Sequence, residues 1–363
     1  MRRETFSLLE ATAVVGITSV IFIYVYNSAN CFHDSDQETE ANFQNLWMQT
    51  QRMIDIVLTV NKANTTWKAQ LNPYTVTDHA SAKLDNSSIN ISLSRNLSFL
   101  SDRVIYDDQG KRRYSFGEEG DGELPRIFDA RKKWSKCQSI KRPTINQGGC
   151  GACWAVSITS MLSDRLCIES NGATQTQLSA EELVTCCSTC YSPLVTGRNG
   201  CNGGSSLGAL RYATVNGLVT GGEHGSDSGC LPYSINATCG SPCAVYSFQY
   251  ADVRTCTRQC RNGHPNGYWK DKFYVTAFYG ATELQGLSSD NITSIQWEIY
   301  QNGPIAMCFT VFEDFFHYRS GVYQQITGSA VYDHCVRVIG WGEDKGILYW
   351  LASNSWGENW GEN

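Results

Sequence analysis

The chain has 363 residues, 42% of them hydrophobic, and a formal net charge of −6 at pH 7. This length accommodates a catalytic domain of about 200–240 residues together with a separate segment. The negative charge gives no argument for nucleic acid as a partner. Sixteen cysteines and six Asn-x-Ser/Thr sequons indicate the secretory route, where disulfides persist and glycans are attached; the sequons are Asn64, Asn86, Asn90, Asn96, Asn236 and Asn291.

Residues 1–33 have the pattern of a targeting segment. Arg2 and Arg3 precede a charge-free run over residues 11–33 whose apolar centre spans residues 13–26. Its length fits either a cleaved signal peptide or an uncleaved signal anchor. In both cases everything after Cys31 is lumenal, and this segment is the one place where contact with a membrane is expected.

Residues 34–123 differ in character from the rest. Apolar residues at helical spacing predict one amphipathic helix over residues 38–61, and a polar, sequon-rich passage follows. Too little apolar surface remains for an independent core, so we interpret the region as a pro-segment that lies across another domain. Lys111-Arg112-Arg113 and the acidic residues 117–123 are either a site where a protease reaches the backbone or a solvated charged loop.

Cys153 occupies the first position of a predicted helix. It follows Gln147-Gly148-Gly149-Cys150-Gly151-Ala152, apolar residues recur at helical spacing after it, and Asn171-Gly172 is a stop signal. The positive end of the helix dipole favours the thiolate, so we expect a lowered pKa and a nucleophilic sulfur. Taken alone, Cys-x-x-Cys also fits a redox pair, half a zinc site, or two disulfide cysteines.

Two residues near the end of the chain favour the nucleophile. His334 follows Cys153 by 181 positions, and Asn354 lies 20 residues further on. A nucleophile needs a base, and the base needs an orienting partner, so these residue types are the ones that nucleophilic catalysis requires.

The remaining elements predict an α+β domain over residues 124–363. Ser179 and Glu182 form a capping box for a short helix, and residues 290–302 read as another helix that Gly303-Pro304 ends. Period-two patterns predict strands at 305–312, 321–324, 334–340 and 348–352. The nucleophile lies in the helical half and the base among the strands, so we expect the active site in a cleft between two lobes.

These motifs resemble the papain family of cysteine peptidases, and within it cathepsin B. The similarity is carried by residues 64–69, 124–131, 147–154, 178–187, 229–235, 302–304, 318–323 and 334–360, and it covers roughly residues 50–363. It implies a pro-segment ahead of a papain-like fold, with a helical left lobe and a β-barrel-like right lobe. It also implies a lysosomal or secreted cysteine peptidase that needs neither cofactor nor metal. The implied partners are protein or peptide substrates, the chain's own pro-segment as intramolecular inhibitor, and cystatin-like inhibitors.

The resemblance assigns the site residues one by one. Cys153 is the nucleophile, His334 its imidazolium partner and Asn354 the residue that orients the ring. Gln147 contributes to the oxyanion hole with the Cys153 backbone N–H. Supporting roles fall to Trp154 and to Trp356, which shields the His–Asn hydrogen bond. The substrate-binding residues are Gly203, Gly204, Ser206, Cys308 and Cys335.

Two departures from cathepsin B bear on specificity. Only Gly240-Ser241-Pro242 separate Cys239 from Cys243, and no histidine occurs between Cys230 and Cys260. The His-His pair that receives a substrate carboxylate in cathepsin B is therefore missing, and we expect an endopeptidase with weak or no dipeptidyl carboxypeptidase activity. At the second specificity subsite, Ser206, Cys308 and Cys335 replace a proline and two alanines; the cysteines are either free thiols or a bridge that narrows the subsite.

The resemblance also implies six disulfides: Cys137–Cys167, Cys150–Cys201, Cys186–Cys256, Cys187–Cys190, Cys230–Cys260 and Cys239–Cys243. The family continues past Asn363 with further strands, so we expect either a C-terminally incomplete enzyme or a truncated, inactive homologue that binds peptides or inhibitors without cleaving them. A membrane-anchored structural ectodomain is the third function class.

Overall fold

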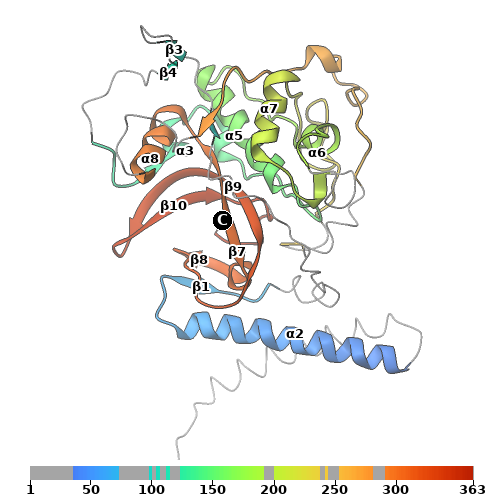
Figure 1. Ribbon diagram of the computed structural model, residues 1–363, viewed down its shortest axis with the longest axis vertical. Coiled ribbons are helices and arrows are strands. Elements are labelled where there is room, and N and C mark those ends of the chain that lie inside the picture. The colour runs from blue at the N-terminus through green and yellow to red at the C-terminus, as the bar shows by residue number, and fades with distance from the viewer. Residues whose placement is uncertain are drawn as a thin grey trace, which may run out of the picture.

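The computed structural model describes residues 36–72, 98–99, 104–106, 112–114, 123–191, 200–237, 242–243, 253–280 and 291–362 (Figure 1). The N-terminal run over residues 11–33 lies outside these ranges. Among the described residues, no helix combines the length and apolar character needed to cross a bilayer.

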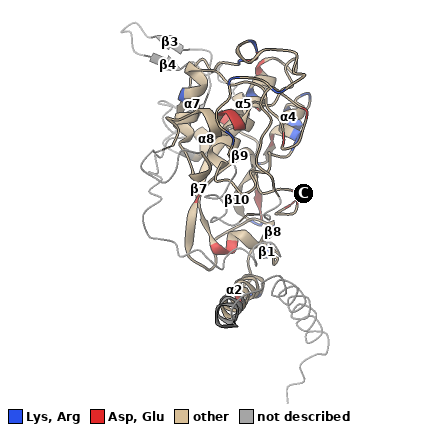
Figure 2. Cartoon of the chain, turned by 90° about the vertical axis from the view of Figure 1, so that its right-hand side faces the viewer, with Lys and Arg blue, Asp and Glu red and all other residues tan. Residues whose placement is uncertain are grey.

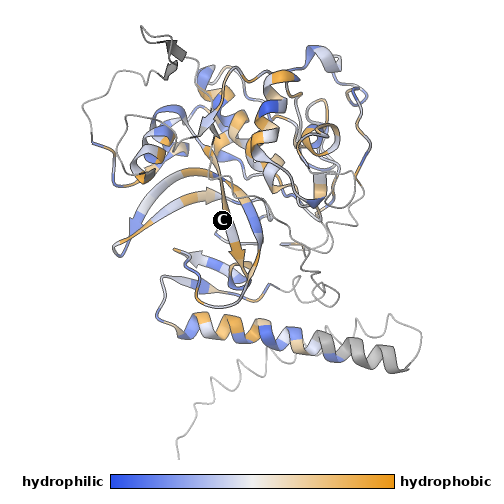
Figure 3. Ribbon diagram, viewed as in Figure 1, coloured by the Kyte–Doolittle hydropathy of each residue, from blue (hydrophilic) through white to orange (hydrophobic). Residues whose placement is uncertain are grey.

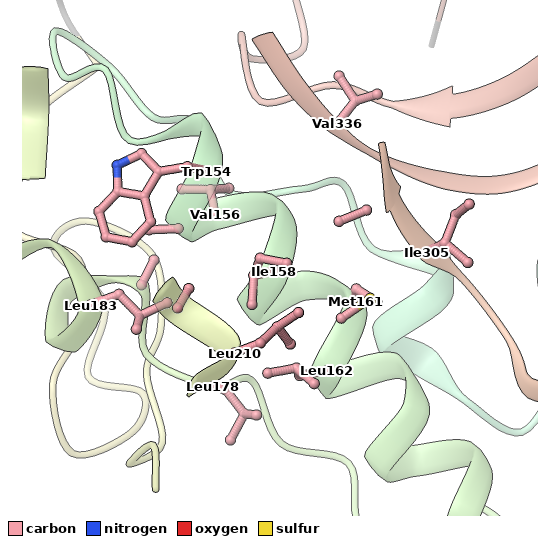
Figure 4. Packing of buried hydrophobic residues seen from close by; sticks show 14 of the residues in the cluster. Trp154, Val156, Ile158, Met161, Leu162, Leu178, Leu183, Leu210, Ile305 and Val336 are labelled. Atoms are coloured by element: carbon pink, nitrogen blue, oxygen red, sulfur yellow. The ribbon is translucent and has the colours of Figure 1, made fainter. Parts of the chain in front are cut away.

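Helix α5 (Cys153–Glu169) is the centre of the helical part of the molecule. Fourteen of its 17 residues are buried, because α4 (Gln138–Lys141), α6 (Ala180–Cys186), α7 (Ser206–Val215) and the sheet surround it. Figure 4 shows Ile158 and Leu162 of α5 packed near Leu210 of α7. The predicted start at Cys153 is confirmed, and Asn171 and Gly172 take the positive φ values of a helix stop.

The shorter predicted helices are also present. Ser179 caps α6 by accepting a hydrogen bond from the Glu182 backbone N–H at 3.0 Å. Helix α8 (Asn291–Asn302) matches the predicted 290–302. The remaining helical elements are α3 (Ala130–Lys133), η3 (Gly200–Asn202), η5 (Tyr268–Lys270) and η6 (Glu313–His317).

The second part of the molecule is a curved antiparallel sheet (Figure 1). Its central strand β9 (Ala330–Asp344) pairs with β7 (Ile305–Phe312), β10 (Ile347–Ser353) and the short β5 (Phe128–Asp129). The strand predictions at 305–312, 334–340 and 348–352 are confirmed, with β9 longer than expected. Helices and strands therefore segregate into two parts, as the α+β prediction requires.

The strand predicted at 321–324 is wrong. The structure instead has β8 (Tyr318–Gly321), which pairs with β1 (Trp67–Ala69). Gly321 has a φ of 97°, which ends the extended run. The following backbone turns toward Asp314, whose carboxylate accepts hydrogen bonds from the N–H groups of Ile326 and Thr327 at 2.7 and 3.0 Å.

Helix α2 (Asp36–Lys62) and strand β1 pack against the sheet side of the molecule, and Figure 2 shows α2 nearly end-on beneath β1 and β8. The helix predicted at 38–61 is confirmed. Its inward residues recur at helical spacing and are buried; they are Thr50, Met53, Ile56 and Val60. Figure 3 shows the apolar positions along the described part of α2.

Four further short strands are described, three of them within residues 34–123. Strand β2 (Ser98–Phe99) pairs with β6 (Tyr279–Gly280), and β3 (Val104–Tyr106) pairs with β4 (Arg112–Tyr114). Two residues of the tribasic sequence, Arg112 and Arg113, are therefore strand residues.

Two buried ion pairs link α5 to other elements. Arg337 of β9 donates to the Asp164 carboxylate at 3.0 Å, and Arg165 lies 2.8 Å from Glu298 of α8. All four side chains are at most 4% exposed. Arg337 also donates to the carbonyl oxygens of Ser139 and Arg142, so both of its terminal nitrogens are hydrogen-bonded at the junction of the two parts.

Candidate active site

Cys153 lies at the N-terminal end of α5, where Ala152 caps the helix without a side-chain hydrogen bond. Its side chain is 8% exposed, and it is the one cysteine among the described residues that forms no disulfide. Burial raises the pKa of this thiol to about 11, although hydrogen bonds from the backbone N–H groups of Cys335, Trp154 and Cys153 itself act in the opposite direction.

This direction corrects the expectation of a lowered pKa. The helix N-terminus does supply backbone donors, but removal of the sulfur from water outweighs them. Burial in this arrangement therefore favours the neutral thiol of Cys153 over its thiolate.

His334 lies on β9 and is fully buried. Its Nε2 is 2.7 Å from Oδ1 of Asn354, which follows β10. Because an amide oxygen can only accept, Nε2 carries the proton and donates, which leaves a lone pair on Nδ1 in the neutral ring. Burial lowers the pKa of His334 to about 4 against the opposing effect of the Asn354 hydrogen bond.

Nδ1 of His334 has no hydrogen-bond partner among the described residues. The Cys153 sulfur is hydrogen-bonded to the backbone N–H of Cys335, the residue after His334. The ring belongs to β9 and the thiol to α5, and the Cys335 N–H links the sulfur to the residue that follows His334. Among the described residues no hydrogen bond joins the thiol and the ring. A basic nitrogen without a partner can accept a proton from a thiol that it reaches.

Aromatic side chains cover the histidine. The Trp356 ring lies 4.7 Å from the His334 ring, is 2% exposed, and packs in turn on Phe315 and Trp360. This cluster keeps water away from the His334–Asn354 hydrogen bond, and it comes from η6 and the chain after β10.

Gln147 is 3% exposed, and both polar atoms of its side-chain amide are hydrogen-bonded. Its Nε2 donates to the Cys150 carbonyl at 2.9 Å, and its Oε1 accepts from Ser355 Oγ at 2.6 Å. The Tyr233 hydroxyl donates to the Gln147 carbonyl at 3.0 Å. Sequence reasoning did not single out Ser355 or Tyr233; Ser355 follows Asn354 directly, whereas nothing local to Tyr233 points to Gln147.

Trp154 and the predicted glycines lie together. The Trp154 indole donates to the Gly200 carbonyl at 3.0 Å, and a Cβ at Gly204 would be 2.3 Å from the Trp154 ring. No side chain fits at Gly204 without moving this ring. Gly203 has a φ of 95° and open space at its Cβ position, so the pair forms a bare backbone edge beside α7.

Ser206, the first residue of α7, faces the strands. Its Oγ is 4.0 Å from the Cys308 sulfur and 3.8 Å from the Cys335 sulfur. The structure resolves the open alternative at these cysteines: they form a disulfide between β7 and β9.

Five of the six implied disulfides are present: Cys137–Cys167, Cys150–Cys201, Cys186–Cys256, Cys187–Cys190 and Cys230–Cys260. Cys243 is also disulfide-bonded, whereas Cys239, its expected partner, lies outside the described residues.

One group of potential metal ligands occurs among the described residues, formed by Cys230, Cys260 and His264. Because the two sulfurs are joined to each other, they provide no thiolate for a metal. The donor set therefore does not fit a zinc site.

Comparisons with known proteins agree with this geometry. Residues 124–363 match the model of the papain family cysteine proteases. The chain is 38% identical over 254 residues to cathepsin B-like cysteine proteinase 1 of Ostertagia ostertagi, covering 68% of each sequence. It is 41% identical over 241 residues to a gut-specific cysteine proteinase of Caenorhabditis elegans, covering 66% of this chain and 67% of the relative.

A solved structure extends the similarity to the segment before residue 124. Procathepsin B S9 from Trypanosoma congolense superposes with a TM-score of 0.58 at 28% identity, over 85% of this chain and 88% of that one. The α+β architecture is thus a papain-like fold. The chain belongs to the papain family of cysteine proteases and is a cysteine-type peptidase of the cathepsin B-like kind.

Proposed function

We propose that the chain is the zymogen of a cysteine endopeptidase that hydrolyses peptide bonds through Cys153, His334 and Asn354. The observation that carries the proposal is the hydrogen bond from His334 Nε2 to Asn354. It leaves Nδ1 as an unpartnered base, one residue before Cys335, whose backbone N–H is hydrogen-bonded to the free Cys153 thiol.

The chemistry follows from these positions. Nδ1 takes the proton of the Cys153 thiol, and the sulfur attacks the carbonyl carbon of the substrate. Negative charge develops on the carbonyl oxygen, where the second N–H of Gln147 Nε2 and the Cys153 backbone N–H are available as donors. The C–N bond then breaks, the leaving amine takes the proton from His334, and a thioester remains. Water, deprotonated by the same nitrogen, hydrolyses the thioester and releases the acid.

Residues 34–123 act in this proposal as the intramolecular inhibitor. Support comes from the docking of α2 and β1 on β8 and η6. Cys153 and His334 are themselves buried, which raises the pKa of the thiol and lowers the pKa of the imidazole. An ion pair forms when the site becomes accessible to water and burial no longer penalises the charges.

One labelling experiment tests the proposal. The full chain is incubated with a thiol-alkylating epoxide before and after mildly acidic activation, and the modified residue is mapped. We expect Cys153 to be labelled after activation, with the H334A variant as a matched control that stays unlabelled. A folded protein without labelling at Cys153 supports the alternative, an inactive homologue that binds peptides or inhibitors without cleaving them; the raised pKa of Cys153 is the observation on its side.

The finer proposal is that dipeptidyl carboxypeptidase activity is weak or absent. The tripeptide between Cys239 and Cys243 contains no histidine, and no cationic pair is available there for a substrate carboxylate. An internally quenched peptide with an amidated C-terminus should be cleaved at least as fast as the same peptide with a free carboxylate. Comparable or faster dipeptide release from the free acid contradicts the proposal.

We also propose that Ser206 and the Cys308–Cys335 bridge line the subsite for one substrate side chain, and that small apolar side chains are preferred there. The bridge places two sulfurs within 4.0 Å of Ser206 Oγ, which narrows the space between α7 and the strands. Profiling with a peptide library tests this, and a clear preference for Arg or Phe overturns it.

Passage through the secretory route is proposed on the disulfides and the sequons. Six disulfides join described cysteines, and such bridges persist in oxidising compartments. Of the sequons, Asn64 and Asn236 are exposed, so both can carry a glycan. A lysosomal or extracellular location is expected, and loss of mass on deglycosylation of the secreted protein checks it.

A further inference from the structure

The Cys308–Cys335 disulfide lies immediately beside the catalytic histidine. Cys308 and Cys335 are register partners in the β7–β9 ladder, and the next pair along is Phe309 with His334. The backbone N–H of Cys335 is hydrogen-bonded to the Cys153 sulfur. One cysteine of this disulfide, Cys335, therefore follows His334 directly and is hydrogen-bonded through its backbone to Cys153.

The bridge is accessible from one side. Cys308 is exposed, whereas Cys335 is 8% exposed. Four of the other described disulfides contain no exposed cysteine, and each has at least one cysteine that is fully or almost fully buried. The exception is Cys186–Cys256, in which Cys256 is exposed. A small thiol in solution therefore meets Cys308 and Cys256 first, and only Cys308 belongs to the substrate-binding region.

We propose that the Cys308–Cys335 bridge is a thiol-sensitive switch that sets which substrate side chains the site accepts. The inference rests on the proposed peptidase function and deepens it, because it assigns a regulation to the same site.

The chemistry is two successive thiol–disulfide exchanges with a low-molecular-weight thiol. A thiolate attacks the exposed Cys308 sulfur, a mixed disulfide forms there, and Cys335 leaves as a thiolate that takes a proton. A second thiolate attacks the sulfur of the small thiol in the mixed disulfide and releases Cys308. The net change is oxidation of two small thiols to one disulfide and reduction of the bridge to two protein thiols.

Reduction alters the shape of the site more than its catalytic contacts. In the oxidised form both sulfurs are held together over Ser206. In the reduced form the exposed Cys308 side chain is free to rotate toward solvent, which widens the space between α7 and β7. The hydrogen bond to Cys153 comes from the Cys335 backbone, which the β7–β9 ladder holds on both sides of the bridge. Selectivity is therefore expected to change while the nucleophile keeps its surroundings.

The experiment measures a ratio of two rates. Two fluorogenic dipeptide amides share Arg next to the scissile bond and differ in the preceding residue, Val in one and Phe in the other. The activated enzyme is equilibrated in buffers of increasing thiol-to-disulfide ratio, and kcat/KM is measured for both. Changes in the fraction of active Cys153 cancel in the ratio. Differential alkylation with mass spectrometry follows each disulfide in the same samples.

We expect the Phe-to-Val ratio to rise by roughly tenfold as Cys308–Cys335 is reduced, since one methylene-sized change in an apolar subsite has an effect of this order. The C308A/C335A variant should show the high ratio in every buffer. The C186A/C256A variant, which removes the other accessible bridge, should switch like the unaltered enzyme.

The outcomes separate the two proposals. If neither substrate is cleaved, the peptidase proposal fails. If both are cleaved but the ratio is constant while the bridge becomes reduced, the switch is overturned. It is equally overturned if Cys308–Cys335 resists reduction until the buried bridges open. The C308S/C335S variant repeats the comparison should the alanine variant not fold.

Discussion

Two interfaces of the strand-rich part of the molecule differ in how exposed their charged side chains are. Between α5 and β9 the contact includes Asp164 and Arg337, both at most 3% exposed, together with an apolar core. Between residues 36–72 and the elements η6 and β8 the contact includes Arg52 and Glu313, whose side chains are 61% and 24% exposed. The first interface removes charges from water and the second leaves them in water.

The difference suggests which interface is permanent and which can open. Breaking a buried ion pair is strongly destabilising, because it leaves a charge buried without its partner. We therefore expect the two parts of the peptidase domain to separate only when the domain unfolds. The pro-segment contact depends on a few apolar side chains around Trp67 and on the short β1–β8 ladder. Such a contact can be released without disturbing the catalytic domain.

The largest effect is expected for Arg337→Ala. Removing this guanidinium leaves Asp164 buried without its partner and leaves two carbonyl oxygens unsatisfied, so the free energy of unfolding should fall by about 3–5 kcal/mol. Urea denaturation measures it. The double variant D164L/R337M should recover part of the loss, and an equal loss in both variants would show that the ion pair is not the cause.

The next effect concerns Trp67→Ala at the other interface. Trp67 is 1% exposed, packs on Tyr323 with ring centroids 5.1 Å apart, and donates to the Gln324 carbonyl at 2.9 Å. Its loss should weaken docking by about 3 kcal/mol. Hydrogen exchange of the α2 and β1 amides should accelerate about a hundredfold while the α5 amides stay protected. Trp47→Ala, at an exposed position of helix α2, is the control with little expected change.

Acid should destabilise the closed site through His334. Burial lowers its pKa in the folded state from 6.5 to about 4. The contribution of the neutral ring to the free energy of unfolding is therefore complete above pH 6.5 and is lost as the pH falls toward 4. The loss approaches ~3 kcal/mol at the acid end. Unfolding free energies at pH 7 and pH 4 should differ less in H334Q than in the unaltered chain. An identical pH dependence in both would rule out this histidine as the source.

The smallest effect is expected for Arg52→Ala. The Arg52–Glu313 pair is 2.8 Å long but solvent-exposed, so its removal should cost less than about 1 kcal/mol of docking free energy. Hydrogen exchange at α2 should change by a few-fold at most, comparable with Lys62→Ala in the same helix. A larger change would mean that the pro-segment interface depends on charge as the inter-lobe interface does.

Local sequence patterns predicted the helices and strands well, but they predicted the direction of the Cys153 pKa shift wrongly. Ser179 with Glu182, the residues after Cys153, and the alternation over residues 305–312 each act within a few positions of the chain, so helix and strand bounds followed from them. The strand expected at 321–324 failed because Gly321 and the distant Thr66 carbonyl, which accepts from Val322 N–H at 3.1 Å, decide the backbone there.

The sequence by itself determined the family and the α+β class, and it predicted the residues proposed as nucleophile, base and orienting amide. Only the tertiary structure decided that Cys308 and Cys335 are bridged, that Ser355 and Tyr233 hold Gln147, and that burial raises the pKa of Cys153 and lowers the pKa of His334. The physical reason is that residue types and short spacings are written along the chain. Burial and contacts between elements arise only when segments distant along the chain pack together, as Gln147 and Ser355 do across a separation of 208 residues.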